Sequence, residues 1–160
     1  MSETAGPLDL QGCVREFHAR YGVAAPALPA LPDGGTVEMR MRLIREETAE
    51  LAAAFAAADL VEVADAIADL LYVTLGTAVA CGIDVAPVFG EVHRSNMTKD
   101  GGPLDGAGKV RKGAGFQPPV LAPLLRAQGW REAAAADAAV SRPAFRGGAA
   151  DDSECGGVPG

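Results

Sequence analysis

Apolar residues recur at helical spacing over much of the chain, whereas the alternation typical of strands is weak throughout. Residues 8–21 predict a short amphipathic helix that ends at Gly22 and leads into a proline-rich, extended connection. The apolar face of this helix consists of Leu10, Val14, Phe17 and Tyr21. The pattern therefore predicts an all-α protein.

Two longer helices are predicted to follow and to form an antiparallel hairpin. The first begins after Gly35, with Thr36 as its N-cap, and runs to about Ala58. The second covers residues 60–81, and Asp59 can cap its N-terminus. A tight turn at Asp59 would place the two helices side by side.

The C-terminal part of the pattern is less regular. Gly82 lies where a glycine that ends a helix belongs, and residues 85–95 predict a fourth, short helix with Pro87 in its first turn. Residues 96–119 are glycine-rich and basic and show no clear period. They predict a loop, with room for a small hairpin around "DGAG".

Length and composition favour one domain, which we expect to span residues 1–130 of the 160. Residues 131–160 are rich in alanine and glycine and predict a disordered tail. Three cysteines without metal-like spacing indicate free thiols in a reducing compartment, and we expect a cytoplasmic protein. The sequence has no purely apolar run of about 18 residues and no signal-peptide pattern, so no membrane span is expected.

The net charge of −7 argues against a nucleic-acid polymer as partner, since such partners are held largely by contacts to phosphates. The charge is also unevenly spread. No lysine or arginine lies between Arg45 and Arg94, where the sequence has nine acids. They are Glu46, Glu47, Glu50, Asp59, Glu62, Asp65, Asp69, Asp84 and Glu91.

Six of these acids form two narrow strips, with three acids on each helix of the predicted hairpin. Between Val61 and Val73 the residues outside the strip are small or apolar, so this helix is predicted to be buried in a bundle with its acids facing the interior or a cleft. The acids of the preceding helix lie within about 100° of one another around its axis. The strips consist of Glu46, Glu47 and Glu50, and of Glu62, Asp65 and Asp69.

Carboxylates that face each other in a low dielectric repel strongly. The hairpin has no basic residue beyond Arg45, so either protonation or divalent cations must neutralise the strips. Oxygen ligands without histidine or cysteine suit Mg²⁺ or Mn²⁺ better than zinc. The alternative is a pair of solvated faces, although such faces usually mix lysine with glutamate.

Several motifs resemble the MazG-like, all-α nucleoside triphosphate pyrophosphohydrolases, a superfamily related to dimeric dUTPases. The segments "EETAE" (46–50) and "EVAD" (62–65) resemble its paired acidic signature, and "ADLLYV" (68–73) also resembles the phosphoribosyl-ATP pyrophosphohydrolases. The resemblance extends to "VREFH", "GIDVAPVFGEVHRSNMTK" and "KGAGFQPPVLAPLL", and so covers residues 10–125.

The resemblance implies a Mg²⁺-dependent hydrolase that cleaves between the α- and β-phosphates of a nucleotide. It implies that metal ligands come from the paired motifs, with Asp69 as a further ligand, and that Glu46 or Glu47 is the general base. The short connection between the helices leaves open whether Glu62 is among the closest ligands. By position, the metal ligands are Glu47, Glu50, Glu62, Asp65 and Asp69, and the substrate-binding residues are Arg94, Asn96, Lys99 and Lys112.

The substrate expected from the resemblance is a (deoxy)nucleoside triphosphate, with dUTP as first candidate. Phosphoribosyl-ATP is an alternative, and so is a non-catalytic helical interaction module. One hairpin cannot bury its second helix on all sides, so we expect a homodimer or a dimer of dimers with a four-helix core and an acidic metal site.

Overall fold

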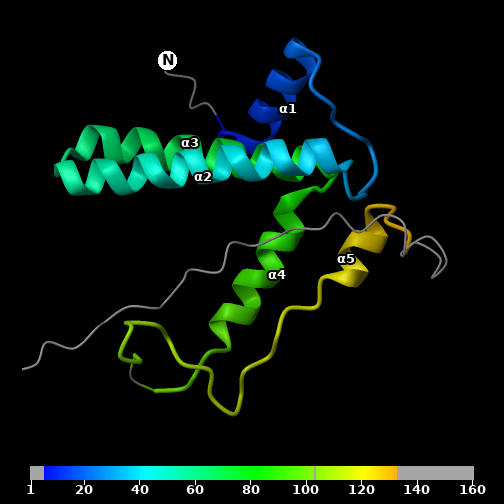
Figure 1. Ribbon diagram of the computed structural model, residues 1–160. Helices are drawn as coiled ribbons and strands as arrows, with labels where there is room; N and C mark the ends of the chain where they lie inside the picture. The colour runs from blue at the N-terminus through cyan, green and yellow to red at the C-terminus, as the bar shows by residue number, and fades with distance from the viewer. Residues whose placement is uncertain (1–5, 103, 133–160) are drawn as a thin grey trace, which may run out of the picture.

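The computed structural model describes residues 6–102 and 104–132, and every regular element in these ranges is helical (Figure 1). The predicted all-α class is therefore confirmed for this part of the chain. The predicted disordered tail lies outside the described residues except for its first two positions. The helices are α1 (Leu10–Tyr21), α2 (Gly34–Ala57), α3 (Leu60–Ala80), α4 (Val85–Met97) and α5 (Ala122–Ala127).

The long helices α2 and α3 form the predicted antiparallel hairpin, joined by a two-residue turn (Figure 1). Ala58 adopts a left-handed conformation with a φ of 54° and ends α2. Asp59 then caps α3, since its Oδ1 accepts hydrogen bonds from the backbone N–H of Val61 at 2.9 Å and of Glu62 at 3.2 Å. The cap fixes where the acidic motif of α3 begins.

Three details of the predicted helices need correction or addition. Asp33 rather than Thr36 is the N-cap of α2, because its carboxylate accepts from both the backbone N–H (3.0 Å) and the hydroxyl (2.7 Å) of Thr36. Gly82 has the left-handed φ of 67° expected of a glycine after a helix. The sequence pattern did not reveal α5, whose six residues are too few to show a period.

The core of a single chain is thin. α1 packs against α3, and most of the buried apolar side chains are small. Large apolar residues of the hairpin stay exposed, among them Phe55 (64%) and Val61 (76%). A single chain therefore leaves α3 partly exposed, as expected of one hairpin. The buried apolar residues are Val14, Ala54, Val63, Ala66, Val79 and Ala80.

α3 is also, by length and mean hydropathy (1.5), the one helix in the described ranges with the composition of a membrane span. A helix at the centre of a bundle has the same composition. Its packing against α1 and α2 and the acids Glu62, Asp65 and Asp69 on its surface favour the bundle interpretation.

The buried side chains of His18 and Arg40 join α1 to α2 beside Gly76 of α3. His18 Nδ1 lies 3.0 Å from the carbonyl oxygen of Ala24, which can only accept, so Nδ1 carries the hydrogen and Nε2 accepts from Arg40 at 3.1 Å. Burial lowers the pKa of His18, and the neighbouring Arg40 adds to this effect. His18 thus has a structural role as a neutral acceptor.

Because Gly76 of α3 has no side chain, it leaves room for the side chains of His18 and Arg40. A Cβ at Gly76 would lie 2.8 Å from the guanidinium of Arg40 and 3.6 Å from His18 Nε2. We predict that Gly76→Ala lowers the free energy of unfolding by about 1–3 kcal/mol through overpacking. Gly90→Ala in α4 is the matched control: nothing lies near its Cβ, so it should stabilise by about 0.5–1 kcal/mol. Urea unfolding measures both, and a neutral Gly76→Ala would contradict the packing described.

Two glutamines fix the direction in which α4 leaves the bundle. Gln11 of α1 donates to the carbonyl oxygen of Ile83 (2.6 Å) and accepts from the N–H of Val85 (3.0 Å). Gln128, just after α5, bonds to both the N–H and the carbonyl oxygen of Asp84, each at 2.9 Å. The start of α4 is thereby held from both sides.

Candidate active site

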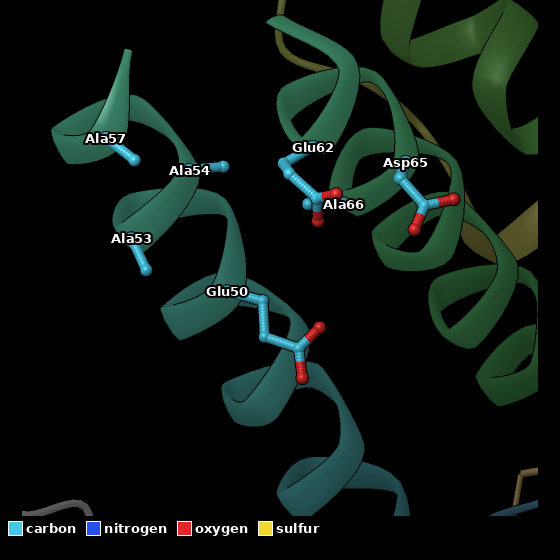
Figure 2. A pocket seen from close by; sticks show the side chains of 7 residues that line it. All are labelled: Glu50, Ala53, Ala54, Ala57, Glu62, Asp65 and Ala66. Atoms are coloured by element: carbon cyan, nitrogen blue, oxygen red, sulfur yellow. The ribbon is translucent and has the colours of Figure 1, made fainter. Parts of the chain in front are cut away.

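Acids from both strips border a common hollow near the turn of the hairpin: Glu50 from α2, and Glu62 and Asp65 from α3. Its volume is about 310 Å³, at the lower end of the range for ligand pockets. Figure 2 shows Glu50 of α2 and Glu62 of α3 extending into the space between the helices, with small alanines around them. The residues that line it are Glu50, Ala53, Ala54, Ala57, Glu62, Asp65 and Ala66.

Glu47 lies where the carboxylates crowd most. Its side chain is half-buried, and the pKa of Glu47 is raised first by loss of water and then by repulsion from Glu50, Asp69, Glu46 and Asp65. The strips of α2 and α3 therefore interact electrostatically within one chain. Glu46 lies 3.9 Å from Arg42 in an exposed i,i+4 pair that stabilises little.

Both strips are exposed. Glu46, Glu50, Glu62, Asp65 and Asp69 all face solvent in this single chain. The pattern predicts that the α3 acids face an interior or a cleft, and in the single chain Glu62 and Asp65 border an open cleft, since no further helix of the described chain covers this side of the hairpin.

The donor chemistry fits a hard divalent cation, since oxygen atoms alone border the hollow as charged ligands. The side chains do not yet converge on one point. Within the described residues, no three Asp, Glu, His or Cys side chains form a ready-made ligand group. An ion would therefore draw the carboxylates inward by changes of rotamer, and would relieve the repulsion at Glu47.

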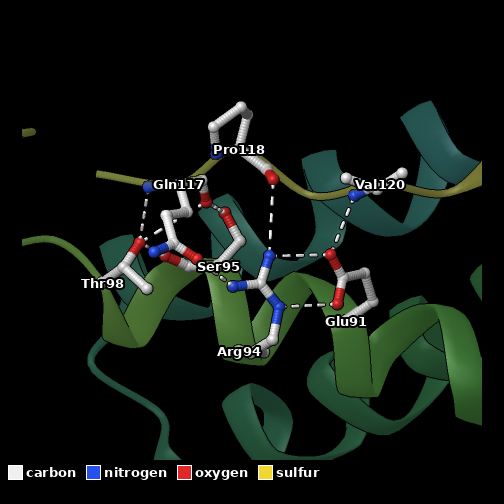
Figure 3. A network of polar contacts seen from close by, with 7 residues as sticks. All are labelled: Glu91, Arg94, Ser95, Thr98, Gln117, Pro118 and Val120. Atoms are coloured by element: carbon white, nitrogen blue, oxygen red, sulfur yellow. Dashed lines mark hydrogen bonds and ion pairs between the residues drawn. The ribbon is translucent and has the colours of Figure 1, made fainter. Parts of the chain in front are cut away.

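Arg94, predicted to bind substrate, has its guanidinium engaged along α4 (Figure 3). It donates to both carboxylate oxygens of Glu91, at 2.7 and 2.8 Å, and to Gln117 Oε1 at 3.1 Å. Glu91 also accepts from the N–H of Val120 at 2.8 Å, and the hydrogen bonds from Arg94 lower the pKa of Glu91 to about 2. In this structure Arg94 holds the returning chain against α4.

Glu91→Gln should loosen this returning chain. The depressed pKa means that the stabilisation from Glu91 is complete above its ordinary pKa of 4.5 and is lost as the pH falls towards 2. At neutral pH the variant removes the charge, and we predict that the Val120 amide exchanges its hydrogen about tenfold faster. Glu132→Gln, which removes an exposed partner of Arg126, is the control and should leave Val120 unchanged. Equal exchange in both variants would refute the role of Glu91.

The other predicted substrate residues lie at or beyond the end of α4. Asn96 is exposed near that end, and its carbonyl oxygen accepts from the N–H of Lys99 at 3.2 Å. Lys99 and Lys112 border a hollow of about 580 Å³ in the glycine-rich segment. Its lining consists of Lys99, Asp105, Lys109, Val110, Arg111 and Lys112.

The turn of this segment is the small hairpin-like feature expected around "DGAG", although no strand is present in its described residues. Asp105 Oδ1 accepts from the N–H groups of Ala107 and Lys109, both at 2.9 Å. Gly101 donates to the carbonyl oxygen of Arg111 at 3.2 Å, which closes the base of the turn. The hollows of the acidic hairpin and of this basic turn have no lining residue in common.

Three polar residues that position these parts gave no prediction from the sequence: Gln11, Arg40 and Gln128. Arg40 could have been recognised from the sequence, because it lies on the same helical face as the apolar residues Val37, Ile44 and Leu51. A cation on such a face is predicted to be buried and to need a partner. The glutamines gave no such signal, since their partners lie far away in the sequence.

A helical hairpin that presents paired carboxylates on facing strips is the architecture of the MazG-like, all-α class. Residues 14–96 match the family model described as phosphoribosyl-ATP pyrophosphohydrolase, which covers just over half of the chain, and the chain belongs to this family within the MazG-like superfamily. No curated protein matches the sequence. The family is one of hydrolases acting on phosphoric anhydrides. The match includes both acidic motifs and ends at Asn96, before Lys99 and Lys112.

Proposed function

We propose that the chain is a Mg²⁺-dependent nucleotide pyrophosphohydrolase that releases pyrophosphate and a monophosphate from a (deoxy)nucleoside triphosphate. The observation that carries this proposal is that carboxylates of both helices, Glu50, Glu62 and Asp65, border one hollow in a chain of the pyrophosphohydrolase family. Such an arrangement is costly unless a cation binds, and triphosphates are cleaved in sites that neutralise phosphoryl oxygens. Mn²⁺ is an alternative ion, and cytoplasmic action on the nucleotide pool belongs to the same proposal.

The ligands proposed for the ion are Glu47, Glu50, Glu62, Asp65 and Asp69. A bound divalent cation would supply charge neutralisation on the phosphates and orientation of water. The carboxylate of Glu47, or of its neighbour Glu46, would accept the proton of the water that attacks phosphorus, while the bond to the pyrophosphate group breaks.

Aromatic residues next to the acidic strip offer a place for the base. Tyr72 follows Asp69 on the same strip of α3, and the ring of Phe17 packs edge-on against it with centroids 5.7 Å apart. Both rings are partly exposed, at 43% for Phe17 and 38% for Tyr72. A planar base can stack on such rings. His18, the residue after Phe17, is buried and accepts a hydrogen bond from Arg40, so it leaves this face to the aromatic rings.

Phosphoribosyl-ATP is the second candidate substrate, and the family match favours it. The long basic segment after "NMTK", which lies beyond the matched residues, favours a deoxynucleotide such as dUTP, whereas "VREFH" lies within the match and does not separate the two. Rates with dUTP, the other deoxynucleotides, ribonucleotides and phosphoribosyl-ATP at equal concentration separate the two. A preference of tenfold or more for phosphoribosyl-ATP would overturn the first choice, while no turnover of any substrate would favour a helical interaction module.

A further inference from the structure

The glycine-rich segment after α4 presents cations that have no counter-ion. Lys99, Lys109 and Arg111 border the hollow of about 580 Å³ and make no ion pair within the described ranges. Lys112 borders the same hollow, and its ammonium lies 4.6 Å from the centroid of the Phe116 ring. These four cations form the basic turn. Like charges gathered around one hollow create a local positive potential that attracts an anion.

The acid in this lining is committed to the fold of the turn. Asp105 Oδ1 accepts from the N–H groups of Ala107 and Lys109, both at 2.9 Å, and Asp105 makes no ion pair within the described part of the chain. The hollow therefore keeps a positive charge on a chain whose net charge is −7. The rest of such a chain repels a long polyanion, so this surface favours a short acidic segment that is held nearby.

The sequence carries a short acidic segment of this kind after Arg146. Residues 151–154, "DDSE", place three carboxylates within four positions, and no lysine or arginine lies between Arg146 and Gly160. This acidic segment lies outside the described residues, and its charge follows from the sequence. Carboxylates form charge-assisted hydrogen bonds with lysine ammonium and arginine guanidinium groups. The acidic segment and the basic turn are thus complementary in charge.

The length of chain between the two parts matches the distance that it must span. Gln128, which follows α5, bonds to Asp84 at the start of α4, whereas the basic turn lies beyond Met97 at the other end (Figure 1). With 13 residues, α4 is about 20 Å long. Residues 133–150 connect the described chain to Asp151, and a flexible chain of 18 residues spans about 20–25 Å on average. A tether whose average span equals the separation gives its ligand the highest local concentration.

We propose that the basic turn binds residues 151–154 of the same chain. Carboxylates of the acidic segment accept hydrogen bonds from Lys99, Lys109 and Arg111, and the segment covers the hollow of the basic turn. The consequence for catalysis rests on the proposed function. Where the basic turn contacts the phosphates of a nucleotide, the acidic segment competes with the substrate and raises its KM. The contact itself is testable without turnover.

Disulfide trapping tests the contact, because Cys155 directly follows the acidic segment. Ala107→Cys places a thiol in the turn without removing a cation, and Cys13→Ser with Cys81→Ser leaves this thiol and Cys155 as the two thiols of the chain. In a buffer of reduced and oxidised glutathione we expect a disulfide between positions 107 and 155 within one chain. It should form at least about tenfold faster than with Ala53→Cys, a matched exposed alanine from the lining of the acidic hollow.

The salt dependence and the connectivity of the disulfide sharpen this test. High salt should remove most of the difference in rate, since it screens exposed charges. Equal rates for Ala107→Cys and Ala53→Cys at low salt would overturn the proposal. A disulfide that joins two chains would overturn it as well, because the acidic segment would then bind another copy.

A second experiment keeps all three cysteines. The triple variant Asp151→Asn, Asp152→Asn, Glu154→Gln removes the charges of the acidic segment, and Asp137→Asn, which removes an earlier acid of the tail, is the control. If the acidic segment occupies the turn for about 70–90% of the time, the triple variant lowers the KM of the nucleotide about 3–10-fold and leaves kcat unchanged. A KM equal to that of the control would contradict the competition.

The two experiments separate the contact from the proposed function. Preferential trapping in a chain that hydrolyses no nucleotide would support the contact and refute the proposed function. An active chain in which Ala107→Cys is trapped no faster than Ala53→Cys would refute the contact and leave the proposed function intact.

Discussion

Glu47→Gln is expected to abolish pyrophosphate release while leaving the helices intact. The substitution keeps the size of the side chain but removes a charge that both the proposed cation and the attacking water require. Loss of one such electrostatic contribution costs about 10²–10³-fold in kcat. Asp65→Asn, on the facing helix, should have an effect of the same order, because α3 supplies three of the five proposed ligands and α2 the other two.

The stability of the same variant separates a functional acid from a structural one. The pKa of Glu47 is raised, so its ionised form is disfavoured in the folded chain. The favourable contribution of the protonated form is complete below the ordinary pKa of 4.5 and is lost as the pH rises through the raised pKa. Without metal at neutral pH, Glu47→Gln should therefore be at least as stable as the wild type. Lower stability would indicate a structural role instead.

Glu38→Gln is the matched control for these experiments. Glu38 is an acid on the same helix, but it borders a different hollow, with Gly35, Met39, Arg42 and Arg45. Its substitution should leave turnover unchanged. A loss of activity equal to that of Glu47→Gln would mean that the acidic face of α2 acts as a whole, and would remove the special role assigned to Glu47.

Mg²⁺ is expected to stabilise the folded chain strongly at neutral pH. The carboxylates of the two strips repel one another without a cation, and an ion that binds only the folded hairpin shifts the unfolding equilibrium. At about 100 times the dissociation constant this amounts to about 2.7 kcal/mol, or a rise in Tm of about 5–10 °C for a domain of this size. Differential scanning calorimetry at pH 7.5 measures the rise.

Two comparisons show whether that rise reports ion binding at the strips. At pH 5 the rise should be smaller, because protons compete for a carboxylate such as Glu47 whose pKa is raised. The double variant Glu47→Gln, Asp65→Asn should lose most of the rise, whereas sodium chloride at matched ionic strength should give little in the wild type. An unchanged rise in the double variant would place the ion elsewhere.

The hairpin and its acidic strips could be predicted because their signals are local. Asp59 sits where it caps one helix and ends the turn from another, and the helical period brings Glu62, Asp65 and Asp69 onto one strip. The N-cap of α2 was misassigned because Asp33 and Thr36 both favour that position, and only the geometry shows that Asp33 accepts from Thr36.

The direction of α4 could not be predicted, because it depends on hydrogen bonds between residues far apart in the sequence. Gln11 accepts from the N–H of Val85, and Gln128 accepts from the N–H of Asp84. The pair Glu91 and Arg94, by contrast, has the i,i+3 spacing of a helical ion pair. That local signal was available, but Arg94 was grouped with the downstream lysines because of its charge.

The exposure of α3 is the main difference between the single chain and the buried helix that its apolar pattern predicts. The apolar background of α3 indicates a buried helix, yet Val61, Ile67 and Leu71 remain exposed here. The apolar positions of a sequence reflect burial in the whole assembly, and they do not show whether the covering residues come from the same chain or from another. The difference between the predicted burial of α3 and its exposure in one chain is the reason to expect a second copy.

The most direct test of the central claim follows the products of nucleotide hydrolysis by the purified chain in the presence of Mg²⁺, with and without chelator. We predict chelator-sensitive formation of pyrophosphate and monophosphate in equal amounts from dUTP or a related nucleotide, and none from Glu47→Gln. Release of orthophosphate and a diphosphate instead, or turnover that persists in excess chelator, would contradict a metal-dependent pyrophosphohydrolase built on the acidic hairpin.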